Sequence, residues 1–173
     1  QELVRRRQLV PSELSLHVDA WPWRLRVRML GGLEVEGVPN IKGAPRRLLQ
    51  AIVALARRSV SHEHIAGRLW PDAEGDATRG VFDTTLYRLR KLLPENVLEL
   101  DGGRIALNRF AVWVDAHAFE HATDAILRRI GADDETAERA GARMFELYRG
   151  PLFGEDDEPW MTGPRERLHE RFL

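Results

Sequence analysis

The chain has no cysteine among its 173 residues, which excludes disulfide bonds and metal sites built on thiolates. It also lacks any apolar run near the roughly 20 residues that a membrane-spanning helix needs. Its first residues do not follow the pattern of a secretory signal. We therefore expect a cytoplasmic protein without a membrane partner.

The net charge of the chain is close to zero, at −1, but the charged residues are unevenly distributed along the sequence. Residues 25–110 hold 14 Lys and Arg against 10 Asp and Glu, a net charge of +4, whereas residues 111–173 hold 8 against 14, a net charge of −6. This asymmetry indicates two modules. The positive module is the better candidate for binding a polyanion such as a nucleic acid.

The segment 76–93, DATRGVFDTTLYRLRKLL, is the part around which we expect the chain to be organised. Its apolar residues are spaced by four, three and four positions, which places them on one stripe of an α-helix: Phe82, Leu86, Leu89 and Leu93. We expect this helix to span about 77–93, with Asp76 capping its first turn and Pro94 ending it.

The polar face of this helix has the chemistry of a surface that contacts DNA bases. Between the apolar positions stand Gly80, Asp83, Thr84, Tyr87, Arg88 and Lys91. Arg and Lys bind guanine or phosphate, Thr contacts bases or the thymine methyl group, and Asp accepts a hydrogen bond from cytosine. An ordinary amphipathic surface helix has a similar composition, so both interpretations stay open at this point.

Shorter elements precede this helix. The expected order is strands over 25–30 and 33–36, a short strand from Ile41, a helix over 45–57, and a helix from a Ser61 cap to Leu69. Pro45 is favourable in a first helical turn, where its missing N–H is not needed.

Two short strands follow Pro94, at 97–100 and 104–107, around the turn residues Asp101-Gly102-Gly103. This is a strong hairpin signal. Strands, three helices and a hairpin in this order predict an α+β fold, the winged helix-turn-helix, with residues 97–107 as the wing. We expect Arg104 at the tip of the wing to enter the minor groove of DNA, whose negative potential attracts Arg.

Residues 25–110 resemble the OmpR/PhoB-type winged-helix DNA-binding domain, in the form found in Streptomyces antibiotic regulatory proteins and related large bacterial transcriptional activators. The resemblance is carried by LRVRMLGGLEVE (25–36), KGAPRRLLQAIVAL (42–55), SVSHEHIAGRLWPD (59–72), TTLYRLRKLL (84–93) and ELDGGRIALN (99–108). The ends of the second and third helices, LWPD and RLRKLL, are its more specific marks.

That family places its third helix in the major groove of double-stranded DNA and its wing in the minor groove. Carried to this chain, the resemblance implies contacts by Arg79, Asp83, Thr84, Arg88, Lys91 and Arg104. It also implies that Arg46, Ser61 and His62 lie near phosphate. The loop 70–77 corresponds to the part of such proteins that often meets RNA polymerase. Gly80 departs from the pattern, because relatives often carry a larger polar side chain there.

Residues 111–173 resemble the opening of the bacterial transcriptional activator domain, an all-α module of tetratricopeptide-like helical hairpins that the family uses for protein contacts and dimerisation. The marks are VWVDAHAFEHAT (112–123), MFELYRGPLFGEDDEPW (144–160) and RERLHERF (165–172). Independently, residues 116–130 and 135–148 have the pattern of amphipathic helices. Residues 1–24, which open on Gln1, are expected to be a linker or the tail of an upstream domain.

One pattern points toward an enzyme. His117, Glu120 and His121 match H-x-x-E-H, in which two histidines on one helix face hold zinc and the glutamate acts as a base. A third ligand is needed, for which only the acidic run 155–158 offers itself, and no second supporting motif occurs. The simpler interpretation is a pair of histidines on a surface helix, without metal, cofactor or catalysis.

We therefore interpret the sequence as that of a sequence-specific DNA-binding transcription regulator that is not an enzyme. Its helical module is expected to make homodimer or polymerase contacts. Two alternatives stay open. One is a protein–protein adaptor that keeps the winged-helix fold and has lost DNA binding, and the other, more remote, is a zinc-dependent hydrolase.

Overall fold

The structure, a computed structural model, describes residue 18 and residues 20–56, 58–73, 75–128 and 134–173. Most of the predicted leader 1–24 lies outside these residues. The chain divides into two compact units. One contains Trp23–Leu25 and Val35–Val112, and the other contains Arg26–Glu34 and Trp113–Leu173, with the described residues that precede Trp23.

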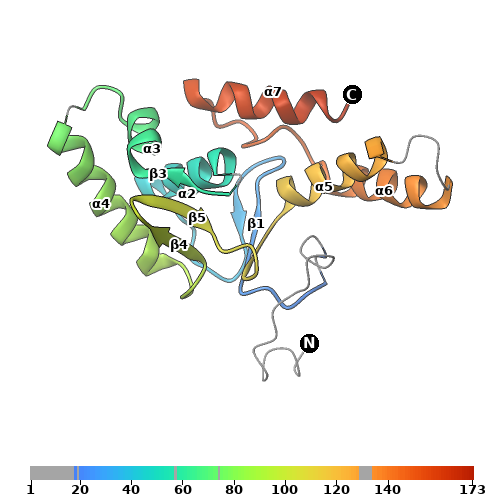
Figure 1. The fold of residues 1–173 in the computed structure, drawn as a ribbon, viewed down its shortest axis with the longest axis horizontal. Coiled ribbons are helices and arrows are strands. Elements are labelled where there is room, and N and C mark those ends of the chain that lie inside the picture. The colour runs from blue at the N-terminus through green and yellow to red at the C-terminus, as the bar shows by residue number, and fades with distance from the viewer. Residues whose placement is uncertain (1–17, 19, 57, 74, 129–133) are drawn as a thin grey trace. The chain divides into compact units, whose positions relative to one another are not determined.

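The unit of residues 35–112 is built on three helices, α2 (Gly43–Leu55), α3 (His62–Leu69) and α4 (Gly75–Leu92). Helix α2 is apolar on most sides and packs against both α3 and α4 (Figure 1). Its Leu48, Leu49 and Ile52 consequently have no exposed surface. Helix α3 begins at the predicted cap, where the Oγ of Ser61 accepts a hydrogen bond from the His64 N–H at 3.2 Å.

The start of α4 differs from the prediction. The helix begins at Gly75, which has a φ of 50°, so Asp76 lies inside the first turn and does not cap it. A glycine adopts this positive φ without steric penalty. The Asp76 carboxylate still suits the positive end of the helix dipole.

A three-stranded sheet completes this unit, with β3 (Val60–Ser61), β4 (Leu98–Asp101) and β5 (Arg104–Leu107) in the order β3-β5-β4. Asp101 pairs with Arg104 in the antiparallel ladder, which leaves Gly102 and Gly103 as a two-residue turn with φ values of 52° and 73°. Two consecutive positive φ angles are what a tight hairpin turn requires. The hairpin was predicted, whereas β3 was not, because two residues are too few to show a period.

A second sheet has the order β2-β1-β6, formed by β1 (Leu25–Arg28), β2 (Glu34–Val35) and β6 (Val112–Val114). The strands predicted at 25–30 and 33–36 are present in shorter form. The third strand predicted at Ile41 is wrong, since Ile41 lies in no strand and α2 begins two residues later. The third strand is β6, which is too distant in sequence for local alternation to reveal the pairing.

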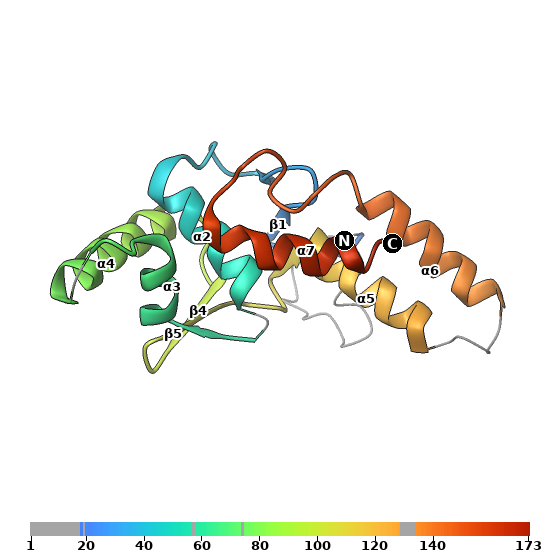
Figure 2. The same cartoon turned by 90° about the horizontal axis from the view of Figure 1, so that it is seen from above.

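The unit of residues 113–173 contains α5 (Asp115–Arg128), α6 (Asp134–Leu147), a short 3₁₀ helix η2 (Pro159–Met161) and α7 (Thr162–Glu170). Helices α5 and α6 lie side by side and run in opposite directions (Figures 1 and 2). Trp113, Phe119 and Phe153 form its most deeply buried aromatic positions. Of the helices in the described ranges, none is both long and apolar enough to cross a bilayer.

A buried carboxylate anchors this second unit. Asp115, 1% exposed, accepts hydrogen bonds from the N–H groups of Met29 at 2.8 Å, Leu30 at 3.0 Å and Ala116 at 2.7 Å. Burial raises the pKa of Asp115 above its ordinary 3.8, while these hydrogen bonds and the positive charge of Arg149 act to lower it. Asp115, the first residue of α5, thus binds the backbone of Met29 and Leu30, which directly follow β1.

Residues 26–34 belong to the same unit as the C-terminal helices, whereas they were predicted to group with the three helices that follow. Backbone hydrogen bonds explain the difference. The N–H of Gly31 donates to the Pro151 carbonyl at 3.0 Å, and the N–H of Phe153 donates to the Met29 carbonyl at 2.9 Å. The domain limits of 25–110 and 111–173 remain predictions.

Candidate nucleic-acid interface

Helix α4 has one buried face and one exposed face. The buried face carries Phe82, Thr85, Leu86 and Leu89. Thr85 is polar, but its Oγ1 donates to the Val81 carbonyl at 2.7 Å, so its burial leaves no hydroxyl unpaired. The predicted apolar stripe is therefore confirmed, and the opposite face is free of core packing.

Six predicted contact residues on α4 are all exposed: Arg79, Asp83, Thr84, Tyr87, Arg88 and Lys91. Tyr87 is 64% exposed, and the Nζ of Lys91 lies 5.5 Å from the centroid of its ring, a cation–π distance. Side chains that can contact bases thus stand on the outer side of a helix that is anchored by its inner side. This is the arrangement that a helix in a major groove requires.

Three arginines of α4 are not engaged by carboxylates. Neither Arg79, Arg88 nor Arg90 forms an ion pair with another residue that the structure describes. Arg90 was not among the predicted contacts. It follows Arg79 and Asp83 by eleven and seven positions, roughly three and two helical turns, so helical spacing could have placed it on their flank. All three guanidinium groups are available to phosphates.

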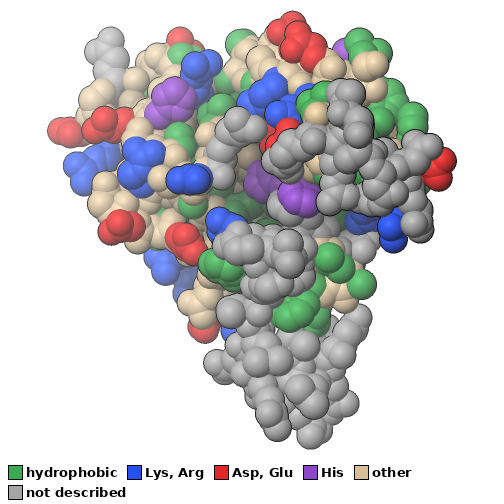
Figure 3. Space-filling model, turned by 45° about the vertical axis from the view of Figure 1, so that its right-hand side comes forward, with side chains coloured by type: hydrophobic (Ala, Val, Ile, Leu, Met, Phe, Trp, Pro, Cys, Tyr) green, Lys and Arg blue, Asp and Glu red, His purple; other side chains and the backbone are tan. Residues whose placement is uncertain are grey.

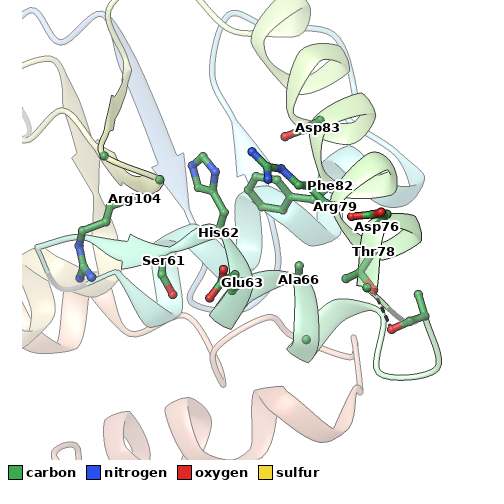
Figure 4. Close-up of a pocket in the computed structure, with 15 residues that line it drawn as sticks. Ser61, His62, Glu63, Ala66, Asp76, Thr78, Arg79, Phe82, Asp83 and Arg104 are labelled. Atoms are coloured by element: carbon green, nitrogen blue, oxygen red, sulfur yellow. Dashed lines mark hydrogen bonds between the residues drawn. The ribbon is translucent and has the colours of Figure 1, made fainter.

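A groove with a volume of about 770 Å³ lies between the first half of α4, the start of α3 and the turn of the β4–β5 hairpin (Figure 4). Five predicted site residues line it, namely Arg79, Asp83, Ser61, His62 and Arg104. Glu63 and Asp76 line it as well, so the groove carries both signs of charge. The packing of α3 on α4, together with the pairing of β3 with β5, brings these distant residues together.

His62 connects three parts of the groove. Its ring lies 4.6 Å from that of Phe82, centroid to centroid, and its backbone N–H donates to the Gly103 carbonyl at 2.9 Å. Its Nε2 is buried and has no hydrogen-bond partner among the described residues. His62 was expected to lie near phosphate, but it also has a packing role that a pattern of polar residues does not reveal.

Arg104 does not extend from the tip of the hairpin. Its Nε donates to the Oγ of Ser59 at 2.8 Å, and its Nη2 donates to the Ser59 carbonyl at 2.7 Å. The side chain points away from α4 (Figure 4). Ser59 was not predicted as a site residue, and nothing in its sequence context marks it.

Arg46 lies apart from the residues that line the groove. It is half-buried near the start of α2 and takes part in an interaction within the protein. Thr84, Tyr87, Arg88 and Lys91 likewise lie outside the groove lining, on the open face of α4. Of the ten predicted residues, five thus line the groove, four lie on the open face of α4, and Arg46 lies apart from both.

Two hydrogen bonds involve described residues at the predicted loop 70–77, the last three residues of which lie in α4. The N–H of Ala73 donates to the Trp70 carbonyl at 3.2 Å, and the Oγ1 of Thr78 donates to the Ala73 carbonyl at 2.7 Å (Figure 4). Pro71 and Asp72 between these contacts are exposed.

The H-x-x-E-H pattern does not form a metal site with other described residues. No group of three or more His, Asp or Glu within the described ranges has a suitable arrangement. The Oε1 of Glu120 lies 3.4 Å from the Nε of Arg167, so the carboxylate predicted to act as a base faces a cation. In the acidic run, the Oδ1 of Asp157 lies 3.5 Å from the Nη1 of Arg165.

Cationic and acidic side chains are interspersed on the face of the molecule drawn in Figure 3. Affinity for a polyanion would depend on individual well-placed cations, such as those of α4, more than on a uniform field.

No protein-family model matches the chain, and no curated protein matches it. Among solved structures, the mixed fold of small sheets and helices is similar to that of Mycobacterium tuberculosis EmbR, in a complex with a low-affinity phosphopeptide. The TM-score is 0.65 at 20% sequence identity, and the match covers 86% of this chain. The chain spans 42% of the EmbR chain. At this identity the likeness shows a shared fold alone.

Proposed function

We propose that this chain is a sequence-specific DNA-binding transcription regulator with a winged-helix domain, in which α4 lies in the major groove and the β4–β5 hairpin lies at the adjacent minor groove. The exposed face of α4 carries the proposal, because Thr84, Tyr87, Arg88 and Lys91 stand opposite a fully packed apolar stripe. The sequence resemblance to OmpR/PhoB-type domains supports it, and so does the order of three helices and a hairpin.

Each exposed group on α4 has a distinct task in this proposal. Arg88 and Lys91 bind guanine or phosphate, Thr84 contacts a base edge or a thymine methyl group, and Asp83 accepts from a cytosine amino group. Arg79, together with Ser61 at the start of α3, lies where a phosphate strand passes beside the helix. Phosphate contacts set the register, and base contacts set the sequence.

The remaining parts of the chain are assigned to protein partners. The helical hairpin of α5 and α6 is a tetratricopeptide-like interaction module that supports a homodimer. The loop 70–77 offers Pro71 and Asp72 to RNA polymerase. A bacterial regulator of this kind acts on the chromosome in the cytoplasm.

The test is a titration of a mixed-sequence duplex at several salt concentrations. The logarithm of the binding constant should fall linearly with the logarithm of salt concentration, because each phosphate contact releases condensed counterions. Selection from random duplexes would then yield the operator. Absence of duplex binding at low salt by the folded protein would overturn the proposal.

One observation favours a second function. Three exposed carboxylates, those of Glu63, Asp76 and Asp83, line the groove beside the proposed DNA-contacting face and would repel phosphate. A protein–protein adaptor with the same fold would tolerate them. The same titration decides, since an adaptor would show no binding that depends on salt.

A further inference from the structure

The guanidinium of Arg104 is bound to the protein itself, although the residue is exposed. Two of its donors, Nε and Nη2, are directed to the two oxygens of one residue, the Oγ and the carbonyl of Ser59. A paired arrangement of this kind uses the fixed fork geometry of the guanidinium. An arginine held in this way cannot extend into a minor groove without giving up both hydrogen bonds.

The segment that Arg104 holds is the one that sets the start of α3. Ser59 directly precedes β3, and Ser61 of β3 pairs with Arg104 in the sheet. The next residue, His62, donates its N–H to the Gly103 carbonyl in the hairpin turn. The hairpin is therefore held at the start of α3 by the two side-chain hydrogen bonds from Arg104 to Ser59 and by backbone hydrogen bonds.

The same segment is in contact with the proposed DNA-binding helix. The His62 ring packs on Phe82, which lies on the buried stripe of α4. A continuous set of contacts thus runs from Arg104 through Ser59 and the α3 start to α4. We expect loss of the hydrogen bonds between Arg104 and Ser59 to change the position of the hairpin relative to the exposed face of α4.

The charge of the hairpin argues against insertion of its strands deep into the minor groove, beside which the hairpin is proposed to lie. Glu99 and Asp101 on β4 are exposed, and Arg104 is the hairpin's only cation in the residues 98–107. The minor groove has a negative potential that attracts arginine and disfavours carboxylates. With Arg104 directed to Ser59, the rest of the hairpin offers no cation to that groove.

We propose that Arg104 is a positioning residue for DNA binding, and that it acts through Ser59 by holding the hairpin at a defined place beside α4. This inference rests on the proposed DNA-binding function. It assigns to Arg104 a role inside the protein, in place of a direct contact with the minor groove, and it adds Ser59 to the functional residues.

The experiment compares duplex binding by Ser59→Ala, Arg104→Gln, the double variant and Arg104→Lys, all in the full chain. Each single substitution should weaken binding to the selected operator by on the order of three- to tenfold. Ser59→Ala removes the acceptor of the Nε hydrogen bond and keeps the backbone carbonyl that accepts from Nη2, whereas Arg104→Gln removes both hydrogen bonds. The double variant should therefore be no weaker than Arg104→Gln alone. Arg104→Lys should not restore affinity, since an ammonium group keeps the charge but cannot form the paired hydrogen bonds.

Two further readouts separate positioning from simple loss of stability and from a direct phosphate contact. Thermal unfolding should change little, while amide hydrogen exchange at residues 98–107 should rise in both single variants. The salt slope of Arg104→Gln should equal that of the wild type, whereas loss of a phosphate contact would lower it by about one. Arg68→Gln, an exposed arginine outside the groove lining, serves as the control.

Three results would overturn the inference while leaving DNA binding intact. These are full rescue by Arg104→Lys, additive effects in the double variant, or a Ser59→Ala protein with wild-type affinity and exchange. A wild-type protein that binds no duplex would instead overturn the proposed function, and the inference with it. The wild-type titration therefore tells the two failures apart.

Discussion

The imidazole of His62 packs against the phenyl ring of Phe82, with centroids 4.6 Å apart and planes tilted by 33°. His62 is the first residue of α3, and Phe82 lies on the buried stripe of α4, so this contact sets the spacing of the two helices at one end. The buried Nε2 of His62 has no hydrogen-bond partner among the described residues. The ring therefore contributes to stability by packing against Phe82, and its Nε2 forms no hydrogen bond with a described residue.

Replacing His62 with Phe should keep the ring contact and remove the unpaired Nε2. We expect the free energy of unfolding to stay the same or to rise by about 1 kcal/mol, because a buried polar atom without a partner is destabilising. His62→Ala should lower it by about 1 kcal/mol through loss of the ring pair. Urea unfolding followed by circular dichroism measures both, and a Phe variant less stable than the Ala variant would contradict the packing role.

Arg88→Ala should weaken binding to the selected operator by roughly 1–3 kcal/mol, the value of a good base contact. Stability should not change, because Arg88 is exposed and has no ion pair with a described residue. Fluorescence anisotropy with a labelled duplex measures the affinity. Arg68→Ala is the matched control on α3, and an Arg88 variant that binds as tightly as this control would remove Arg88 from the interface.

Asp115→Asn should change how stability depends on pH. Because burial raises the pKa of Asp115 above 3.8, the folded state keeps this proton to higher pH than the unfolded state does. The group's contribution to stability is therefore greatest at acidic pH and declines as pH rises from about 4 through the raised folded-state pKa.

The asparagine at this position has no proton to lose and offers one acceptor oxygen in place of two. We expect the variant to be less stable than the wild type by about 1–3 kcal/mol, through impaired pairing of the Met29 and Leu30 N–H groups. Urea titrations between about pH 4 and pH 7 should show this difference shrinking as pH rises. A difference that grows with pH would refute the assigned direction of the shift.

Gly154→Ala should destabilise the unit of residues 113–173. Gly154 has a φ of 62°, and an added Cβ would stand 2.9 Å from the Gly31 carbonyl oxygen. Strain of this kind costs about 1–3 kcal/mol. Gly141→Ala, in helix α6 with no atom within 4 Å of the new Cβ, should be neutral or stabilising by about 0.5–1 kcal/mol. Calorimetry would compare the two, and equal effects would contradict the close approach at Gly31.

Zinc analysis of the purified protein should find no stoichiometric metal. The carboxylate of Glu120 faces Arg167, and the described residues provide no third ligand for His117 and His121. Zinc at one equivalent that survives dialysis would revive the hydrolase interpretation.

Much of the unit of residues 35–112 could be predicted from the sequence. The spacing of Phe82, Leu86 and Leu89 predicted which face of α4 is buried, and Asp101-Gly102-Gly103 predicted the hairpin turn. The exposed positions of α4 followed from the same period. The roles of these positions in binding stay predictions, because exposure is necessary for a contact with DNA and does not establish one.

The parts that could not be predicted depend on residues far apart in the chain. Ile41 was expected to begin a short third strand, but the third strand of that sheet is β6. The contact between Arg104 and Ser59 joins residues 45 positions apart, and that between Asp115 and Met29 joins residues 86 positions apart. Neither pair carries a local signal, since arginine, serine and aspartate are common on protein surfaces and Met29 contributes only its backbone N–H.

What the sequence by itself determined is local: helix periods, the Ser61 cap, the glycine turn and the exposed row of polar side chains on α4. These features depend on interactions within a few residues, so neighbouring side chains are enough to specify them. The tertiary structure alone decided which strands share a sheet, that residues 26–34 pack with the C-terminal helices, and that the hairpin arginine is directed into the protein. The physical reason is that these outcomes depend on which distant hydrogen-bonding groups meet when the apolar faces are buried together.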